Sequence, residues 1–271
     1  MMQSIVLPLK KNAIILLFIS LIQGILFQPA IGTTEEKVYG ASPGEKLFFN
    51  VHWMGVPGGR AEMSMEMAKE GEYKIKAMVE TIGVVSLFHP IHDFIYSFGD
   101  RLPNGEFVSR KFIRDKQRGK KFRNTTVTFD QKNRVVTRIS TYKKPIIINT
   151  STDNIKDPMT IFYAIRSLPK LTPNTTLHWL SVGKKEHKVR IEIGEPKQKS
   201  VPLGRHNIIP VKIIEPNGVG MVSQEEALTI WLSADKRRMP YRVETRLSIG
   251  SVAADLIKYD DGLGGHVELR E

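Results

Sequence analysis

Apolar and polar residues alternate along most of this chain, which is the pattern expected of strands that bury one face. The alternation is clearest in three consecutive segments between residues 46 and 81. Their apolar members at every second position are Leu47, Phe49, Val51, Trp53, Ala61, Met63, Met65, Met67, Tyr73, Ile75, Ala77 and Val79. Methionines two residues apart share one side of a strand, but they form no stripe on a helix. The pattern therefore predicts three consecutive antiparallel strands.

Similar segments recur through the chain, separated by turn residues, and they predict about twelve strands in all. The later segments are 107–114, 121–129, 134–141, 176–182, 188–193, 208–214, 226–233, 241–248 and 251–259. Many short strands with regular turns are typical of antiparallel sandwiches and barrels. We expect an all-β fold, either a large antiparallel β-barrel or a curved open sheet or sandwich, in one domain that spans residues 33–271.

One segment departs from this pattern and predicts an amphipathic helix over about residues 157–168. Asp157 is a favourable N-cap, Pro158 suits the first helical position, and Pro169 ends the segment. The apolar residues at helical spacing are Ile161, Phe162, Ile165 and Leu168. The polar residues off this stripe are Thr160, Arg166 and Ser167. We expect the stripe to dock on the sheet or to close the mouth of a barrel.

The first 32 residues have the composition of a secretory signal. Lys10 and Lys11 precede an uncharged apolar run at 13–27, and a small-residue site follows at 30–32. The run is shorter than the roughly 20 residues that a membrane-spanning helix needs. We expect a signal peptide at 1–32, export to the periplasm, and a mature chain that does not span the membrane. An uncleaved N-terminal anchor is the alternative.

Composition narrows the choice of partners. The 271 residues include no cysteine and carry a formal net charge of +12. Without disulfides, an exported domain relies on burial for its stability. The positive charge would attract anionic envelope polymers or lipid phosphates, and we expect an exported protein to have no nucleic-acid partner. The densest basic run, 110–123, is interpreted as a solvated hairpin whose charged edges also prevent aggregation.

The stretch 55–59 (GVPGG) is rich in glycine but does not fit a phosphate-binding loop. Such a loop leads into a helix, whose free N–H groups bind the anion, whereas a strand follows here. We interpret the stretch as the corner of a hairpin in which Gly58 and Gly59 supply positive φ angles.

A longer stretch around this corner, 44–63 (GEKLFFNVHWMGVPGGRAEM), resembles the opening hairpin of a bacterial exported family, domain-of-unknown-function family 3108. Three further segments resemble the family in order along the chain: 98–112 (FGDRLPNGEFVSRKF), 157–168 (DPMTIFYAIRSL) and 227–244 (ALTIWLSADKRRMPYRVE). The resemblance covers most of residues 33–271 and implies a β-rich envelope protein. It implies no established activity and no catalytic residues.

Residues 89–93 (HPIHD) hold the only close histidine–aspartate cluster in the sequence. Two histidines spaced in this way, without a glutamate base or a distant cysteine, are weak evidence for zinc. We therefore predict no metal and no cofactor, and no serine stands in a Gly-x-Ser-x-Gly elbow. If the protein is a hydrolase of wall or lipid substrates, the candidate residues are His52, His89, His92 and Asp93.

We expect a non-enzymatic envelope protein, because a barrel of this size can enclose an apolar ligand and a helix can cover it. The expected ligand is apolar or lipid-like, with anionic envelope polymers as the alternative partner. The residues predicted to line its site are Trp53, Met63, Met65, Phe162, Trp179 and Trp231. Besides the hydrolase, a scaffold in an envelope complex stays open: a packed core at these positions favours the scaffold, and a void favours the ligand carrier.

Overall fold

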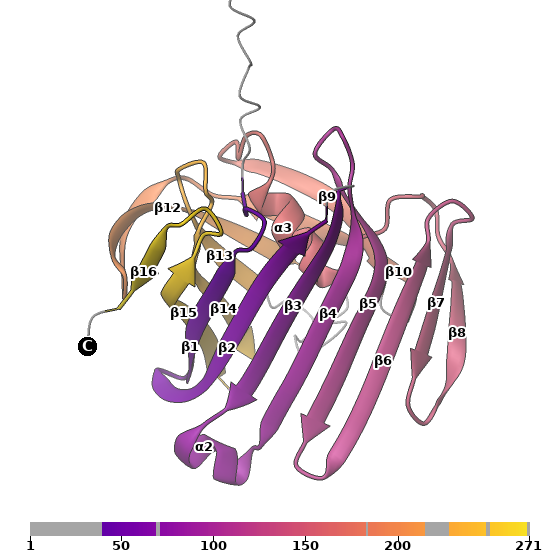
Figure 1. Cartoon of the computed structure of the whole chain (residues 1–271), viewed down its shortest axis with the longest axis horizontal. Helices are drawn as coiled ribbons and strands as arrows, with labels where there is room; N and C mark the ends of the chain where they lie inside the picture. The colour runs from indigo at the N-terminus through magenta and orange to yellow at the C-terminus, as the bar shows by residue number, and fades with distance from the viewer. Residues whose placement is uncertain (1–39, 69–70, 183, 215–227, 248–249, 270–271) are drawn as a thin grey trace, which may run out of the picture. The chain divides into compact units, whose positions relative to one another are not determined.

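The computed structural model describes residues 40–68, 71–182, 184–214, 228–247 and 250–269 (Figure 1). The predicted signal segment 1–32 lies outside this part of the chain. The two helices among the described residues are α2 (Gly83–Phe88) and α3 (Pro158–Arg166). The strands are β1 (Lys46–Trp53), β2 (Val56–Met67), β3 (Glu72–Thr81), β4 (Ile91–Arg101), β5 (Phe107–Arg118), β6 (Lys121–Asp130), β7 (Val135–Ser140), β8 (Lys143–Asn149), β9 (Thr175–Val182), β10 (Glu186–Ile193), β11 (Lys197–Val201), β12 (Gly204–Ile214), β13 (Leu228–Ser233), β14 (Pro240–Leu247), β15 (Gly250–Asp260) and β16 (His266–Glu268).

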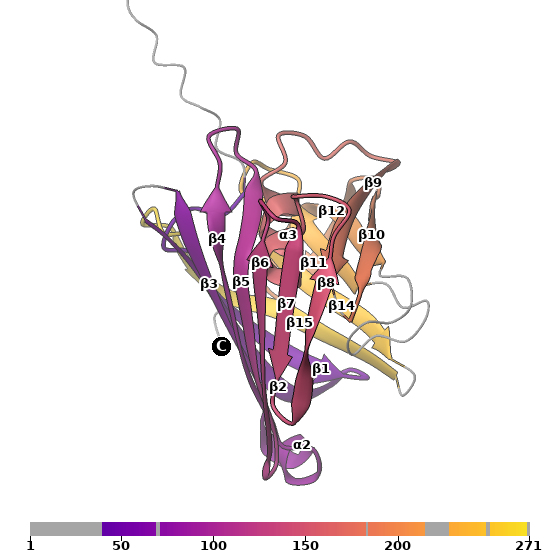
Figure 2. The ribbon, with the colours of Figure 1, turned by 90° about the vertical axis from the view of Figure 1, so that its right-hand side faces the viewer.

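These strands form one antiparallel sheet, which confirms the all-β prediction. Along the sheet the order is β8-β7-β6-β5-β4-β3-β2-β1-β15-β14-β13-β12-β10-β9, with β11 beside β12 and β16 beside β15. The sheet curves until β9, β10 and β12 lie opposite β4–β6 (Figure 2). Because its path ends at β8 and β9, the sheet is open, and the curved open sheet is the architecture found among those expected.

The sheet has more strands than the alternation predicted, because four of them lack a clear apolar face. β4, β8, β11 and β16 were not among the predicted segments. In β4, Asp93 and Ser97 occupy buried positions where an apolar residue was expected. β8, β11 and β16 carry mostly polar or half-exposed residues and lie at or near edges of the sheet. Period-two hydrophobicity detects strands through burial, so such strands are missed.

The segment before α3 spans the gap between the two ends of the sheet. Ile155 forms a parallel bridge with Leu180 of β9, supported by the Lys156 N–H to Leu180 C=O hydrogen bond of 3.1 Å. From the other side, the Gln131 amide donates to the Ile155 carbonyl at 2.8 Å and accepts from its N–H at 3.1 Å. This segment satisfies edge groups that an open sheet would leave unpaired.

Helix α3 lies between the two halves of the curved sheet (Figures 1 and 2). The predicted N-cap is confirmed, because Asp157 accepts hydrogen bonds from the backbone N–H groups of Met159 and Thr160. The amphipathic expectation was too narrow: Thr160 and Arg166, off the apolar stripe, are buried too. A helix packed on both sides has no solvent face, so its polar residues need partners inside the protein.

The corner of the first hairpin is built differently from the sequence prediction. Met54 and Gly55 have φ angles of 49° and 83°, the two positive values of a type I′ turn, and β2 begins directly afterwards. Gly58 and Gly59 lie within β2 and are not among the residues with positive φ. They are small for packing reasons: a Cβ at Gly59 would lie 2.7 Å from the Glu80 carbonyl oxygen.

Candidate ligand-binding face

One side of the sheet, here called the inner face, carries α3. Ser97 of β4 and Ser109 of β5 donate hydrogen bonds to Asp157 Oδ2 at 2.8 and 2.7 Å. The Thr160 hydroxyl donates to the same oxygen at 2.6 Å, and Tyr73 OH lies 2.6 Å from Thr160 Oγ1. Burial, and then the Asp157 charge, raise the pKa of Tyr73. Each member of this buried network has a partner, so the network fixes the start of α3 to β3–β5.

The other end of α3 is fixed by a buried ion pair. Arg166 Nη1 and Nη2 donate to the two Glu45 carboxylate oxygens at 2.6 and 2.7 Å, and Nε donates to the Arg238 carbonyl at 3.0 Å. Burial alone would lower the pKa of Arg166, but the Glu45 carboxylate outweighs it and raises that pKa. Both charges of this pair are therefore buried and satisfied, and the pair closes this part of the inner face.

Beyond α3, the inner face continues toward the end of the sheet that carries α2. One row of paired residues crosses six strands there: Phe49, Ala61, Val79, Asp93, Lys116 and Arg123, on β1 to β6 in turn. The first three members are apolar and the last three are charged. Paired residues in an antiparallel sheet point to the same side, so the row places an apolar strip next to a charged strip on one face.

Around the charged strip, five cations lie near the single carboxylate of Asp93. This basic cluster consists of Arg114, Lys116, Arg118, Arg123 and Arg138, with Asp93 among them. Asp93 is buried and pairs with two of the five: Arg114 Nη2 and Arg118 Nη2 donate to its Oδ2 at 2.9 and 3.0 Å. The carboxylate is thus already used by two guanidinium groups, and the cluster retains an excess of positive charge.

Lys116 and Arg123 are the pair in this cluster that indicates what the inner face binds. They face each other directly in the β5–β6 register, and among the described residues neither forms an ion pair with a carboxylate. Burial, and then the Arg114 and Arg118 charges, lower the pKa of Lys116; its β4 partner Asp93 opposes this to a smaller extent, and Arg123 adds to it. Burial, and then the Arg123 charge, likewise lower the pKa of Arg138. Like charges directly opposite each other destabilise a sheet, so this face has the electrostatics of an anion site.

The comparisons with known proteins agree with this fold. The family model described as a protein of unknown function (DUF3108) matches residues 49–257. The chain belongs to this family. It is also similar to a solved beta-barrel-like protein of domain of unknown function DUF1849 from Brucella abortus, with 10% identity, a TM-score of 0.54, and coverage of 82% of this chain and 98% of that chain. That likeness supports the barrel-like fold alone.

A second solved structure, a protein with a YmcC-like fold from Bacteroides fragilis, shares 12% identity over 81% of this chain and 96% of that chain. Its TM-score of 0.30 is too low to support any argument. A search of curated proteins finds no match to this member of the DUF3108 family.

The six residues predicted to line a ligand site fall into three places. Met63, Met65, Phe162 and Trp179 come together in or against the hydrophobic core around α3. Trp231 belongs to a second core cluster, where the Lys199 Nζ lies 3.9 Å from its ring centroid. Trp53 is half-buried and packs edge-on against His89, with ring centroids 6.2 Å apart. Met65 and Phe162 are buried by packing, which favours a solid core next to α3.

The residues named for a hydrolase have different partners. Asp93 is paired with two arginines, as described above. His52 Nδ1 lies 3.5 Å from Asp255, and His92 Nε2 lies 3.7 Å from Glu80. His89 contacts Trp53 at the end of α2. The described contacts therefore join none of these histidines to Asp93, and a nucleophile–base–acid relay would need such contacts.

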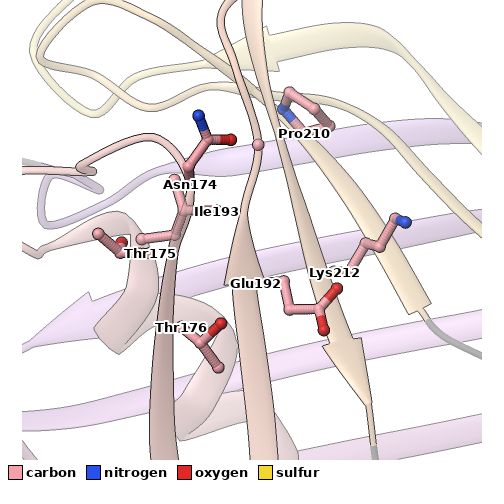
Figure 3. Close-up of a pocket in the computed structure, with 8 residues that line it drawn as sticks. Asn174, Thr175, Thr176, Glu192, Ile193, Pro210 and Lys212 are labelled. Carbon is pink, nitrogen blue, oxygen red and sulfur yellow. The ribbon is translucent and has the colours of Figure 1, made fainter.

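A pocket of about 360 Å³ lies elsewhere, on β9, β10 and β12 (Figure 3). Its lining residues are Asn174, Thr175, Thr176, Glu192, Ile193, Gly194, Pro210 and Lys212. Glu192 and Lys212 are register partners, so the charges of this pocket balance across the strand pair. The inner face differs from this pocket, because there two cations, Lys116 and Arg123, face each other.

The sequence did contain a signal for the basic cluster. Arg114, Lys116 and Arg118 stand at every second position of β5, which places them on one side of a strand. The interpretation of 110–123 as a solvated hairpin was therefore incomplete. On β5, the residues at odd positions from Lys111 onward face outward, whereas those at even positions from Phe112 onward belong to the inner face.

Proposed function

We propose that this protein is a non-enzymatic, exported protein of the cell envelope that binds an anionic amphiphile on its inner face. The amphiphile combines an acidic headgroup with an apolar chain, as a phospholipid or a lipid-like precursor does. The observation that carries the proposal is the directly opposed pair of Lys116 and Arg123. Such a pair costs stability in the free protein and is relieved when an anion lies between the two cations.

The neighbouring strip supports an amphiphile rather than a simple anion. Val79 and Ala61 continue the same row away from Asp93 and are half-buried. A chain attached to an anion held at Lys116 and Arg123 would lie along this apolar strip, where each buried methylene contributes about 0.8 kcal/mol. The closed packing around α3 limits the ligand to the part of the inner face nearer α2.

Export and the envelope location rest on the sequence of residues 1–32, which lie outside the described part of the chain. A signal of this composition directs a chain to the compartment that contains lipid phosphates and anionic polymers. The proposed location is therefore one in which an anionic amphiphile is available. Detection of a mature chain that begins near Thr33 in the periplasmic fraction tests this part of the proposal separately.

Isothermal titration calorimetry of the purified mature protein tests the ligand class. Three probes separate the contributions: dodecyl phosphate below its micelle concentration has both parts, dodecyl maltoside has only the chain, and inorganic phosphate has only the anion. We expect dodecyl phosphate to bind more tightly than either of the others. Replacing both Lys116 and Arg123 by Gln should weaken its binding by roughly ten- to a hundredfold, because each lost bond involves a charged group.

Lys111→Gln is the matched control. Lys111 is an exposed lysine on the same strand, and its side chain points to the opposite face. The control should bind dodecyl phosphate as the parent does. Equal binding of dodecyl phosphate and dodecyl maltoside, or equal weakening by the control and by the inner-face variants, would refute the proposed site.

A further inference from the structure

The end of the sheet next to the basic cluster exposes a group of large apolar side chains. Three chain segments form this end, here called the α2 tip: residues 54–56, 82–90 and 118–122. The large hydrophobic residues exposed in these segments are Met54, Val56, Ile82, Val84, Leu87, Phe88 and Phe122. Figure 1 shows α2 and the β5–β6 turn at the same end of the sheet.

Specific contacts join the 82–90 segment to β2 and to the β5–β6 turn. The Ile82 N–H donates to the Gly58 carbonyl at 2.9 Å, and Val85 fills the space above Gly58. The Gly119 N–H donates to the Pro90 carbonyl at 3.2 Å, and this bond ties the β5–β6 turn to the end of the α2 segment. The exposed side chains therefore project from a built surface and not from separate loops.

Helix α2 is oriented with its apolar side outward. None of its residues is buried, and Val84, Leu87 and Phe88 are 70%, 78% and 73% exposed. These three residues stand at i, i+3 and i+4, the spacing that forms one stripe on a helix. Surface helices of water-soluble domains turn such a stripe to the core, and a six-residue helix is too short to be stable by itself. The stripe is thus presented to something outside the chain.

The charge of the tip identifies the chemistry of that partner. Its three segments contain Arg118, Lys120 and Lys121 and no aspartate or glutamate. Apolar side chains that project from turns and are flanked by cations match an anionic lipid surface, where the apolar groups enter the interface and the cations meet headgroups. A protein partner would instead require a broad complementary surface, and the projecting turns do not provide one.

We infer that the α2 tip docks on the surface of a membrane containing anionic lipids. Val84, Leu87 and Phe88 enter the interface, and Lys120 and Lys121 contact lipid phosphates. The docking surface shares only Arg118 with the basic cluster, and it does not require the ligand site of the proposed function. It deepens that proposal in one respect: β5 runs from Lys116 to Arg118 at the tip, so docking would bring the inner face to the lipid layer.

Co-sedimentation with vesicles tests the docking directly. The mature protein is mixed with vesicles of phosphatidylcholine alone or of phosphatidylcholine with phosphatidylglycerol, at low and at high salt. We expect binding to the vesicles with phosphatidylglycerol, and weaker binding at high salt because the cations are screened. The double variant Leu87→Ser/Phe88→Ser should bind about tenfold less or weaker still, since it loses the inserted groups. Lys120→Gln/Lys121→Gln should remove most of the dependence on phosphatidylglycerol.

Leu263→Ser is the control for hydrophobic exposure. Leu263 is 75% exposed, nearly as much as Leu87, but it lies in the turn between β15 and β16, away from the tip. This control should bind vesicles as the parent does. Failure of the parent protein to bind phosphatidylglycerol vesicles, or equal loss in Leu263→Ser and in the tip variant, would overturn the inference.

A second measurement locates the inserted residue. In Leu87→Trp, the new indole should be quenched by brominated lipids in the vesicles, whereas the new indole of Leu263→Trp should not be quenched. The outcomes also separate this inference from the proposed function. Lys116→Gln should lose dodecyl phosphate and keep vesicle binding, and the Leu87→Ser/Phe88→Ser variant should do the reverse.

Discussion

Replacing Lys116 by Gln should stabilise the free protein, because the substitution removes a positive charge that faces another positive charge. Lys116 faces Arg123 across β5 and β6, with Arg114 and Arg118 on the same side of its own strand. A like-charged pair in direct opposition costs about 0.2–1 kcal/mol. We expect Lys116→Gln to raise the free energy of unfolding by that amount. For a domain of this size the melting temperature should rise by roughly 0.4–4 °C.

The dependence of the free energy of unfolding on pH tests independently whether the charge of Lys116 destabilises the fold. The pKa of Lys116 is lowered in the folded protein, so the folded state releases this proton at a lower pH than the unfolded state does. Between the two pKa values the unfolded state binds more protons, and stability rises with pH. The charge of Lys116 therefore destabilises the fold at neutral pH. The Lys116→Gln variant should lack this rise at alkaline pH.

A double-mutant cycle isolates the repulsion between the two residues. Lys116→Gln and Arg123→Gln are made singly and together, and unfolding in urea is followed by tryptophan fluorescence and by far-ultraviolet circular dichroism. The gain from both should be smaller than the sum of the single gains, since either substitution removes the repulsion. Single variants that each lose more than about 1 kcal/mol, or a cycle without coupling, would show that the pair is not in conflict.

The ligand should reverse the ranking of these proteins. At a dodecyl phosphate concentration of 100 times its dissociation constant, the parent would gain about 2.7 kcal/mol from binding. The doubly substituted protein would gain little, because it lacks the two cations. The parent is therefore expected to be the less stable protein without the ligand and the more stable one with it. Lys111→Gln should follow the parent in both conditions.

Four further substitutions test the structure around α3 and the first hairpin. Glu45→Gln and Arg166→Met should each lower the free energy of unfolding by about 3–5 kcal/mol, and the double variant by much less, because only the singles leave a buried charge unpaired; urea unfolding of the three proteins measures this. Asp157→Ala should cost more than the roughly 1 kcal/mol of an ordinary N-cap, because three buried hydroxyl groups also lose their acceptor. If thermal unfolding shows a loss no larger than that of an ordinary N-cap, the network does not contribute as described. Gly59→Ala should destabilise by about 1–3 kcal/mol through contact with the Glu80 carbonyl, and an unchanged melting temperature would refute that contact.

The sequence predicted the parts of the fold whose residues follow their local pattern. The first three strands, the helix and its Asp157 cap were all visible in hydrophobic period and capping chemistry. β4 was missed because its inner positions include Asp93 and Ser97, whose partners lie far away in the chain. Local pattern cannot show that Ser97 will meet Asp157, since that contact depends on how the sheet curves.

Only part of the candidate site could be predicted from the sequence. The basic residues at alternate positions of β5 were visible in the sequence. The opposition of Lys116 to Arg123 follows from the β5–β6 register, and the position of Val79 next to Asp93 follows from the β3–β4 register. The six apolar residues chosen for a ligand site were selected by type. Type alone does not separate a residue that fills a core from one that lines an open face, and four of the six pack around α3.

The distribution of unfavourable features along the molecule argues that its function lies at one end. At the α3 end, costly groups are satisfied: Arg166 has Glu45, and Asp157 has three hydroxyl donors. At the α2 end, two costs persist together, namely the opposed pair of Lys116 and Arg123 and the outward apolar stripe of α2. Either cost could be removed by one substitution to a polar residue without disturbing the sheet. A chain that pairs these buried charges at one end and leaves the other exposed in both charge and hydrophobicity is shaped for an anionic, apolar partner there.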